Sequence, residues 1–361
     1  MKTASNTLQF VEITPEEFRK FAEKSPYQSF MQTPEIAKLR ETDGWTAHYL
    51  AAKAGNNIKA ATLLVSKPNF LGKSTFLAPG GPLLDFEDKT LTKFFLKNLK
   101  DYVKNHNGYS LQISPYYELI ERGRNGEKIE GGFNRSSAIK TLLGLNFKAT
   151  AHTTQPKYLF VMDIKGRSSE ELFADQKRNT RNHVRKAEKM GVKIRELNRE
   201  ELSILKDITE KTSKRRGFTD RPLSYYEQMY DLFHSRGEVK FLVAEADSIP
   251  LSAAMFMLTG DEIVYLFSGS DEQYMHDYNA QYLIQWHIIK YAAENGFKRY
   301  NFYGIHGLPD ENHKDGIYDF KKGFDSRYGH VVELIGAFET SVNTPVYKFR
   351  QFLSKLKNLK P

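Results

Sequence analysis

Two stretches of the chain share one order of strands and turns, and this repetition most constrains the fold. Residues 47–85 contain an apolar strand, a turn rich in Gly and Asn, a second apolar strand, and a third strand that ends near Gly80. Residues 239–272 repeat this order and end near Gly269. The shared order of strands and turns predicts a structural duplication, although the two stretches share little sequence identity.

Each half also contains a helix, a Gly-containing stop and a further strand. Residues 136–150 fit this description, with a serine as the helix N-cap, and residues 279–305 fit it with a helix that ends near Gly296. A mixed α/β half with antiparallel hairpins resembles the GNAT (acyl-CoA N-acyltransferase-like) fold. We therefore expect an α/β protein of two GNAT-like domains packed together, the first at 1–150, to which 327–361 returns, and the second at 151–326.

The composition excludes several classes of protein. The 361 residues include no cysteine, which removes disulfides and thiolate chemistry and suits a reducing compartment. The ten histidines are scattered and lack paired-ligand spacing, so a zinc enzyme is not expected. The N-terminus lacks the apolar segment of a signal peptide, and no apolar run approaches the ~20 residues that span a bilayer. These features predict a cytoplasmic protein.

A short stretch near the C-terminus, GIYDFKKGFD at 316–325, places a lysine in an aromatic stripe. On a helix, Ile317, Phe320 and Phe324 share one side with Lys321, whereas Lys322 points the opposite way. Two interpretations of Lys321 remain open. Its stem can lie along apolar surface while its charge stays in water, or its charge can await a negative group brought by a substrate.

The net charge of +9 favours anionic partners, and much of it is clustered at residues 176–192. Four cations there line one helical face, and only Glu188 compensates them at helical spacing: Arg178, Arg181, Arg185 and Lys189. A solvated helix face and a phosphate-binding face are both consistent with this pattern.

Two further basic segments allow two interpretations each. Arg221 precedes Pro222 at an expected helix start, where an arginine either shares an anion with the helix end or pairs with an acid such as Asp220. The run 346–361 sets apolar positions beside cations, as in an interfacial helix on anionic lipid or a terminal helix docked on its own domain. Its apolar residues are Phe349, Phe352, Leu353, Leu356 and Leu359, and its cations are Lys348, Arg350, Lys355, Lys357 and Lys360.

Six stretches, in order along the chain, together resemble the FemABX family of non-ribosomal peptidyltransferases. They are SPYQSFMQTPEIAKLR, RNTRNHVRKAEKMGV, GFTDRPLSYYEQM, EIVYLFSGS, YNFYGIHG and GIYDFKKGFD. The resemblance implies transfer of an amino acid from aminoacyl-tRNA to the stem-peptide amine of a peptidoglycan precursor, either lipid II or UDP-MurNAc-pentapeptide, without metal, ATP or other cofactor. It also implies two GNAT-like domains, and the direct run from Asp247 into the next strand matches members without a coiled-coil arm.

The resemblance assigns roles to individual residues. Phe320 and Lys321 match a Phe-Lys pair implicated in holding the charge that develops on the attacked carbonyl. Lys38, Arg221 and Tyr225 match positions that hold the precursor. The helix that carries Arg178, Arg181, Arg185 and Lys189 would suit tRNA phosphates.

The chain departs from the family's pattern at three positions. Ile36 stands where many members have Trp, Phe267 where many have Tyr, and Ser114 where a carboxylate is sometimes proposed to assist. The sequence assigns no general base, although Asp319, His306 and Tyr303 lie near the Phe-Lys pair.

Two other functions compete with this interpretation. One is a CoA-dependent GNAT acyltransferase, although the chain has no Q/R-x-x-G-x-G/A turn for a pyrophosphate. The other is a non-enzymatic module that binds RNA or membrane through the basic helix and tail. Within the transferase interpretation the acceptor stays open. The tail favours the lipid form and a peripheral contact with the anionic inner leaflet, whereas the missing arm favours the nucleotide form.

Overall fold

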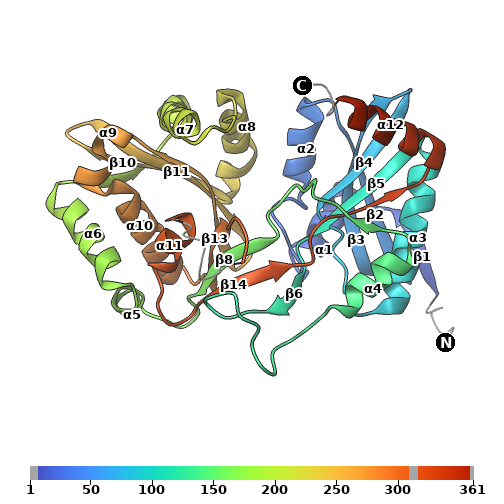
Figure 1. Ribbon diagram of the computed structural model, residues 1–361, viewed down its shortest axis with the longest axis horizontal. Coiled ribbons are helices and arrows are strands. Elements are labelled where there is room, and N and C mark those ends of the chain that lie inside the picture. Colours follow the sequence, from blue (N-terminus) through green and yellow to red (C-terminus); the bar gives the residue numbers. More distant parts are fainter. Residues whose placement is uncertain (1–6, 309–315, 358–361) are drawn as a thin grey trace. The chain divides into compact units, whose positions relative to one another are not determined.

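The structure is a computed structural model that describes residues 7–308 and 316–357 (Figure 1). The chain forms two compact units. Unit 1 comprises Met1–Ile120, Phe133–Lys157 and Glu333–Pro361, and unit 2 comprises Glu121–Gly132 and Tyr158–Val332. Among the described residues, no helix is long and apolar enough to cross a membrane.

Unit 1 is built on a seven-stranded sheet. Its strands, in sheet order, are β1 (Leu8–Glu12), β2 (Thr46–Ala54), β3 (Asn57–Phe70), β4 (Lys73–Gly80), β5 (Gly108–Pro115), β15 (Phe338–Ser341) and β7 (Lys148–Ala149). Its helices are α1 (Pro15–Ala22), α2 (Pro34–Thr42), α3 (Lys89–Asn105), α4 (Ser137–Gly144) and α12 (Thr344–Lys357). The side of α3 that carries Leu91, Phe95 and Leu99 is buried, which makes α3 the main helical cover of this core.

Unit 2 is built on an eight-stranded sheet. Its strands, in sheet order, are β6 (Glu118–Glu121), β14 (Gly329–Leu334), β8 (Tyr158–Asp163), β13 (Arg299–Gly304), β12 (Glu262–Ser270), β11 (Ile249–Thr259), β10 (Val239–Ala246) and β9 (Lys193–Glu196). Its helices are α5 (Ser169–Ala174), α6 (Arg178–Lys189), α7 (Leu202–Arg216), α8 (Leu223–Phe233), α9 (Glu272–Tyr278), α10 (Ala280–Glu294) and α11 (Gly316–Lys322), with short 3-10 turns η1 (Arg199–Glu201) and η2 (His234–Arg236).

The predicted duplication is confirmed by the strand pairing. In unit 1, β2, β3 and β4 form an antiparallel meander, and β4 then pairs in parallel with β5 after the chain has passed through α3. In unit 2, β10, β11 and β12 form the same meander, and β12 pairs in parallel with β13 after α10. The helix equivalent to α10 is therefore α3. The helix, glycine stop and strand expected at 136–150 form as α4 and β7, but β7 is an edge strand, so α4 does not occupy the position of α10.

A two-residue turn joins β10 to β11. Asp247 and Ser248 both have positive φ, at 49° and 64°, as in the type I′ turns that close tight hairpins. A turn this short leaves no room for an inserted coiled-coil arm, which confirms the armless form expected from the sequence.

Candidate active site

A cavity of about 790 Å³ opens within unit 2, which is within the size range of small-molecule sites. The C-terminal end of α7, the end of β12, the start of α10, and α11 all contribute to its wall. The lining residues are Thr212, Arg215, Arg216, Phe218, Tyr265, Ser268, Gly269, Ser270, Met275, Gln281, Tyr282, His306, Gly316, Ile317, Phe320 and Lys321.

Lys321 is buried at the wall of this cavity. Only 6% of the residue is exposed, and its Nζ donates a hydrogen bond to the carbonyl oxygen of Gly304. The neighbouring Phe320 packs edge-on against Tyr282, with ring centroids 5.0 Å apart. Lys322 instead donates to the Asn125 side chain on the other side of the helix. The ammonium of Lys321 is thus held inside the protein, where charges interact more strongly than in water.

The carbonyl group that holds Lys321 lies in an irregular part of β13. The register between β13 and β8 shifts between Asn301 and Gly304, and Tyr303 has φ of 62°. A side chain at positive φ costs free energy that the surroundings must supply. Here the side-chain oxygen of Asn301, a fully buried residue, accepts a hydrogen bond from the backbone N–H of Tyr303 at 2.7 Å. This irregularity lies next to the carbonyl that receives the lysine.

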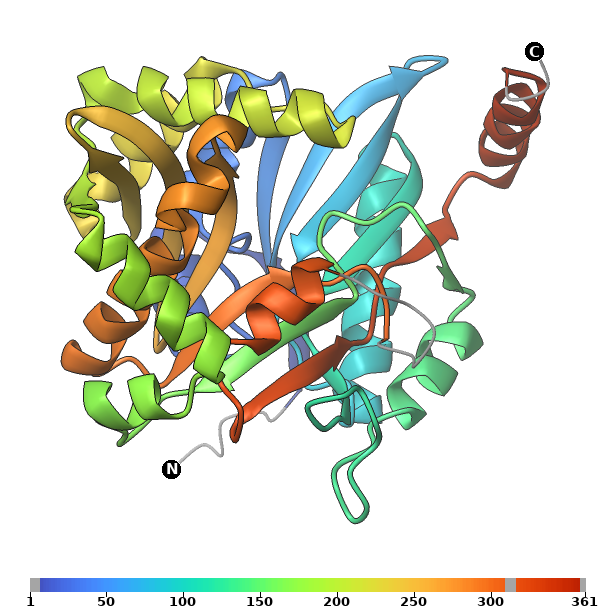
Figure 2. The same ribbon diagram turned by 60° about the vertical axis from the view of Figure 1, so that its left-hand side comes forward.

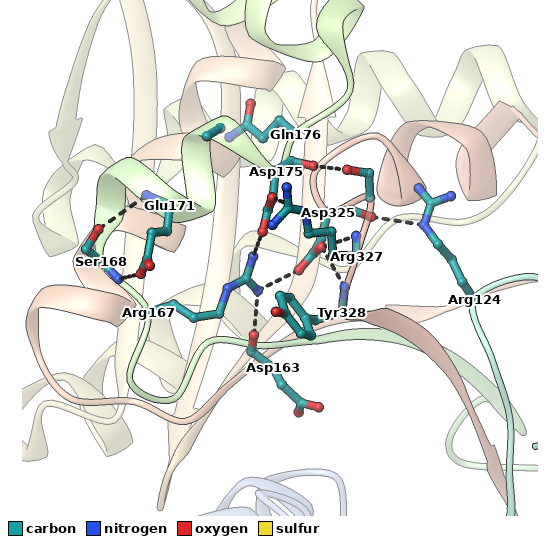
Figure 3. A network of polar contacts seen from close by, with 12 residues as sticks. Arg124, Asp163, Arg167, Ser168, Glu171, Asp175, Gln176, Asp325, Arg327 and Tyr328 are labelled. Atoms are coloured by element: carbon teal, nitrogen blue, oxygen red, sulfur yellow. Dashed lines mark hydrogen bonds and ion pairs between the residues drawn. The ribbon is translucent and has the colours of Figure 1, made fainter.

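A buried polar network, which we call the Asp325 network, holds the turn that follows α11 (Figure 3). The carboxylate of Asp325 is fully buried. Its Oδ2 accepts from Arg167 Nη1 at 2.7 Å, and its Oδ1 accepts from the backbone N–H groups of Arg327 and Tyr328. Arg167 also binds Asp175 at 2.7 Å. Since Asp325 lies four residues after Lys321, this network fixes the end of the helix that carries the lysine.

The start of α6 approaches the same turn closely. The backbone N–H of Lys177 donates to the Gly323 carbonyl at 2.8 Å, and a Cβ at position 323 would lie 2.4 Å from the hydroxyl oxygen of Thr180. Figure 2 shows α6 in green passing beside α11 in orange-red. Glycine at position 323 is therefore required by the space between these two helices.

The charge on the cavity wall is strongly positive. Arg215 and Arg216 end α7 just before Gly217, whose left-handed conformation stops the helix. None of the described residues that line the cavity is Asp or Glu. Burial raises the pKa of the Tyr265 phenol to about 12, so this hydroxyl, which contacts Ser268, is a neutral group at pH 7. The cavity suits an anionic ligand.

Comparison with known proteins identifies the group to which this chain is related. A model of the FemAB family matches residues 13–248 and 240–355. The chain belongs to the FemAB family. It is 27% identical to aminoacyltransferase FemA of Staphylococcus aureus, including strains MRSA252 and N315, over 97% of this chain and 99% of FemA. The resemblance predicted from the six stretches is confirmed, and the protein is an aminoacyltransferase.

Solved structures confirm the fold. A crystal structure of FemX aligns with a TM-score of 0.81 and 22% identity, covering 94% of this chain and 99% of FemX. A tandem GNAT protein from the clavulanic acid biosynthesis pathway aligns with a TM-score of 0.55 and 11% identity, covering 93% of this chain and 99% of the other. The FemAB chain therefore consists of two GNAT-like domains, as expected.

The predicted precursor-binding residues lie in both units of the FemAB protein. Lys38 is exposed on α2 of unit 1, whereas Arg221 and Tyr225 lie at the start of α8 in unit 2. The Arg221 guanidinium lies 5.2 Å from the centre of the Tyr225 ring, and this ring packs edge-on against Phe267. Asp220 binds Lys206 at 2.9 Å and Tyr226 at 3.0 Å, so the carboxylate next to Arg221 is already engaged elsewhere.

The predicted basic helix forms as α6, and its four cations are not equivalent. Arg181 is half-buried and donates to the carbonyl oxygens of Ala174 and Gln176, which ties it to the preceding loop. The Arg185 guanidinium lies 5.3 Å from the centre of the Phe173 ring. Arg178, Arg185 and Lys189 are exposed. Three of the four cations are thus open to solvent on one helix.

The other positions raised by the sequence are also described. Ile36 is buried in α2, and Ser114 is buried in β5, where its carbonyl oxygen accepts from Gln155 at 2.8 Å. His306 lines the cavity from the loop after β13, and Asp319 is exposed on α11. Among the described residues, no three potential ligands gather as a metal site.

Sequence reasoning missed several residues that shape the FemAB cavity, chiefly Arg215, Arg216, Gln281 and Tyr282. The dibasic Arg215-Arg216 step directly before Gly217 was the one local signal available, because a helix stop at a glycine fixes where the last side chains project. Gln281 and Tyr282 belong to α10, and nothing in their own segment indicates which side of that helix meets a cavity.

Proposed function

We propose that this FemAB protein transfers an amino acid from aminoacyl-tRNA to the stem-peptide amine of a peptidoglycan precursor, as one step in building the cell-wall cross-bridge. The observation that carries the proposal is the buried ammonium of Lys321 at the wall of a cationic cavity. Phe320 and Lys321 also stand where the family resemblance expects the Phe-Lys pair.

The reaction would proceed by attack of the acceptor nitrogen on the ester carbonyl carbon of the charged tRNA. A carbon–nitrogen bond forms, and the carbonyl oxygen becomes an oxyanion. When this intermediate collapses, the bond from the carbonyl carbon to the ribose oxygen breaks, the ribose hydroxyl leaves with a proton, and an amide remains. The hydrogen bond to Gly304 holds the Lys321 ammonium in place, so its charge is positioned before the oxyanion develops.

The amine must lose a proton during this attack. Tyr265 is a poor acceptor for it, because a phenol whose pKa is near 12 holds its proton at neutral pH and its phenolate form is scarce. No carboxylate is found among the described residues that line the cavity. We propose that a group on the substrate, such as the ribose of the tRNA, takes the proton.

The remaining residues would bind the two substrates. We propose that Lys38, Arg221 and Tyr225 hold the phosphates or the muramyl-peptide part of the precursor. Phosphates of the tRNA acceptor arm would lie along Arg178, Arg181, Arg185 and Lys189, and phosphate contacts of this kind weaken as salt rises. The exposure of Arg178, Arg185 and Lys189 supports this role, whereas Arg181 is partly committed to the loop before α6.

A transfer assay tests the proposal. Purified protein would meet labelled aminoacyl-tRNA pools together with UDP-MurNAc-pentapeptide or, separately, lipid II. Lys321→Met should lower the transfer rate by about a hundred- to a thousandfold, as expected for loss of one oxyanion-stabilising group. Lys322→Met is the matched control, because Lys322 points away from Lys321 and should leave the rate within about threefold of wild type.

Two results would overturn the proposal. One is the absence of transfer to either acceptor with any charged tRNA. The other is an equal loss of rate in both lysine variants, which would show that the α11 lysines act only on folding. Label on one acceptor alone would settle whether the enzyme uses the lipid-linked or the nucleotide-linked precursor.

A further inference from the structure

Unit 1 carries an exposed apolar surface formed by two segments far apart in the sequence. The β3–β4 hairpin turns at Leu71, which is 67% exposed, and α12 presents Phe349 and Phe352, which are 49% and 57% exposed. The ring of Phe70 lies 5.9 Å from that of Phe349, so the hairpin tip and the helix adjoin. Figures 1 and 2 both show α12 near this tip. We call these four residues, together with the Lys and Arg residues at 66–75 and 344–353, the hairpin–α12 surface.

Part of α12 is docked on its own unit, which fixes the direction of its exposed side. The Arg350 guanidinium lies 5.5 Å from the centre of the buried Tyr109 ring, and the Tyr347 hydroxyl donates to Glu339 at 3.1 Å. Phe349 and Phe352 are three positions apart and share a helical face. The sequence allowed either a docked helix or an interfacial one, and α12 combines a docked side with an exposed aromatic side. Leu356 and Leu359 lie outside the described side chains.

Leu71 does not favour the stability of the folded protein. It occupies the first position of a two-residue turn with φ of 49°, followed by Gly72 with φ of 68°. Turns of this kind favour Asn, Asp or Gly, because other side chains are strained at positive φ. A leucine here is strained, and it exposes apolar surface to water as well. Both costs are explained if the side chain is covered when the protein works.

The charges around this surface indicate what covers it. Residues 66–75 and 344–353 together contain four Lys or Arg residues and no Asp or Glu. Association of two copies through the same surface would bring these cations face to face, which opposes a symmetric dimer. An anionic lipid surface complements the charge and accepts apolar side chains at its headgroup boundary.

We infer that the hairpin–α12 surface docks unit 1 on an anionic membrane, with Leu71, Phe349 and Phe352 entering the interface and the surrounding lysines and arginines contacting lipid headgroups. This inference extends the peripheral contact with the inner leaflet that the sequence analysis expected, by naming the surface responsible. The biological reason for docking rests on the proposed function. The docking itself does not, because membrane binding requires neither tRNA nor acceptor.

Vesicle flotation of the full chain tests the inference. The protein should float with vesicles of phosphatidylcholine mixed with phosphatidylglycerol and stay behind with phosphatidylcholine alone. Binding should weaken as the screening length falls from ~30 Å in dilute salt to ~3 Å at molar salt. Lys348→Gln should weaken binding about fivefold. Lys20→Gln, at an exposed lysine on α1, should not weaken it.

The apolar contribution has its own matched pair of variants. The double variant Phe349→Ser with Phe352→Ser should weaken binding roughly tenfold or more. Leu143→Ser, at a leucine of α4 that is similarly exposed at 52%, should leave binding unchanged. Leu71→Asn separates folding from docking. Because Asn tolerates positive φ, this variant should fold at least as stably as wild type while its vesicle affinity falls.

Three outcomes would overturn the inference. They are unchanged vesicle affinity in the Phe349 and Phe352 variant, equal binding to neutral and anionic vesicles, and a dimer in light scattering that the same variant dissociates. The last outcome would assign the surface to a second copy of the chain. Flotation needs no substrate, so its result stands whether or not transfer to a peptidoglycan precursor is observed.

Discussion

Asp325→Asn is the substitution that most directly tests how unit 2 holds Lys321, the lysine proposed to act in catalysis. The asparagine keeps the shape of the side chain and one acceptor for the backbone N–H groups of Arg327 and Tyr328. It removes the negative charge opposite Arg167, and its amide can place a donor where Arg167 Nη1 now finds an acceptor at 2.7 Å. The variant therefore breaks one buried ion pair with little change in volume.

The expected loss of stability follows from the burial of that pair. Removing one partner of a buried ion pair costs about 3–5 kcal/mol, and a hydrogen bond to a charged group contributes about 1.5–3 kcal/mol. Arg167 keeps its second partner, Asp175, so its charge is not left uncompensated. We expect the free energy of unfolding of unit 2 to fall by about 2–3 kcal/mol.

The effect on catalysis should exceed the effect of stability alone. The Asp325 network holds the turn directly after Lys321, and a displacement of about 1 Å at a reacting group can cost about a hundredfold in rate. We expect kcat for transfer to fall by roughly ten- to a hundredfold while KM for aminoacyl-tRNA changes little, because the network does not line the cavity.

Tryptophan fluorescence allows unit 2 to be followed separately. The chain has two tryptophans, and Trp286 packs against Phe173 of α5 in unit 2, with ring centroids 4.9 Å apart. A Trp45→Phe background leaves Trp286 as the only reporter of urea unfolding. The matched control is Asp231→Asn. Asp231 makes a similar two-bond contact with Arg199 at 2.6 and 2.9 Å, but both side chains are nearly half exposed. That control should cost at most about 1 kcal/mol and leave kcat unchanged.

The reasoning is refuted if Asp325→Asn and Asp231→Asn shift the Trp286 transition equally, because burial would then not govern the cost. A large loss of stability with unchanged kcat in the folded fraction would refute the positioning role alone. In that case the Asp325 network would serve only to hold α11 on its unit.

Two further perturbations test the packing of unit 2. Gly323→Ala should destabilise unit 2 by about 1–3 kcal/mol, because the added Cβ would lie 2.4 Å from the Thr180 hydroxyl oxygen. Adding Thr180→Ala should restore part of this loss in the same urea assay. Equal losses with and without Thr180→Ala would contradict the contact. Burial alone would raise the pKa of Asp220, but hydrogen bonds led by that from Lys206 outweigh it and hold the pKa below its ordinary value. Its contribution to stability is therefore present above about pH 4 and is lost as the pH falls through the lowered pKa, so Asp220→Asn should flatten this part of the stability profile.

The strands could be predicted from sequence because their signals are local. Apolar runs separated by Gly, Asn, Asp or Ser mark each hairpin, and the two meanders follow from them. The sequence pattern did not show that α3 is the counterpart of α10, even though α3 carries clear helix signals. Asp88 caps the N-terminus of α3, and Leu91, Phe95 and Leu99 recur at helical spacing. The crossover helix is identified only by the strands it joins, and residue pairing across a sheet is not a local property.

In the candidate site, too, the local sequence predicts some features, whereas others depend on contacts with distant parts of the chain. Helical periodicity placed Lys321 beside Ile317 and Phe320, and these three residues line the same cavity in the structure. The group that receives the ammonium, the Gly304 carbonyl, directly follows Tyr303, whose φ is positive. Tyrosine is not a residue that signals this conformation, so no reading of the segment would have found it. The cavity arginines at the end of α7 depend likewise on how that helix packs on β12.

The groups that position Lys321 and the turn after it lie far from one another in the sequence. For this reason the family resemblance suggests a role for Lys321 more readily than the local sequence pattern does. Arg167 and Asp325 are 158 residues apart in the sequence, and Gly304 and Lys321 are 17 apart. A buried lysine is tolerated only where such distant groups accept its charge and fix its position. The local pattern around Lys321 therefore indicates that a lysine is unusual there, whereas its proposed role as a fixed cation depends on groups contributed from β13 and on the turn held by Arg167. This division explains why Asp325→Asn, which changes no residue of the cavity, is the sharper test of the mechanism.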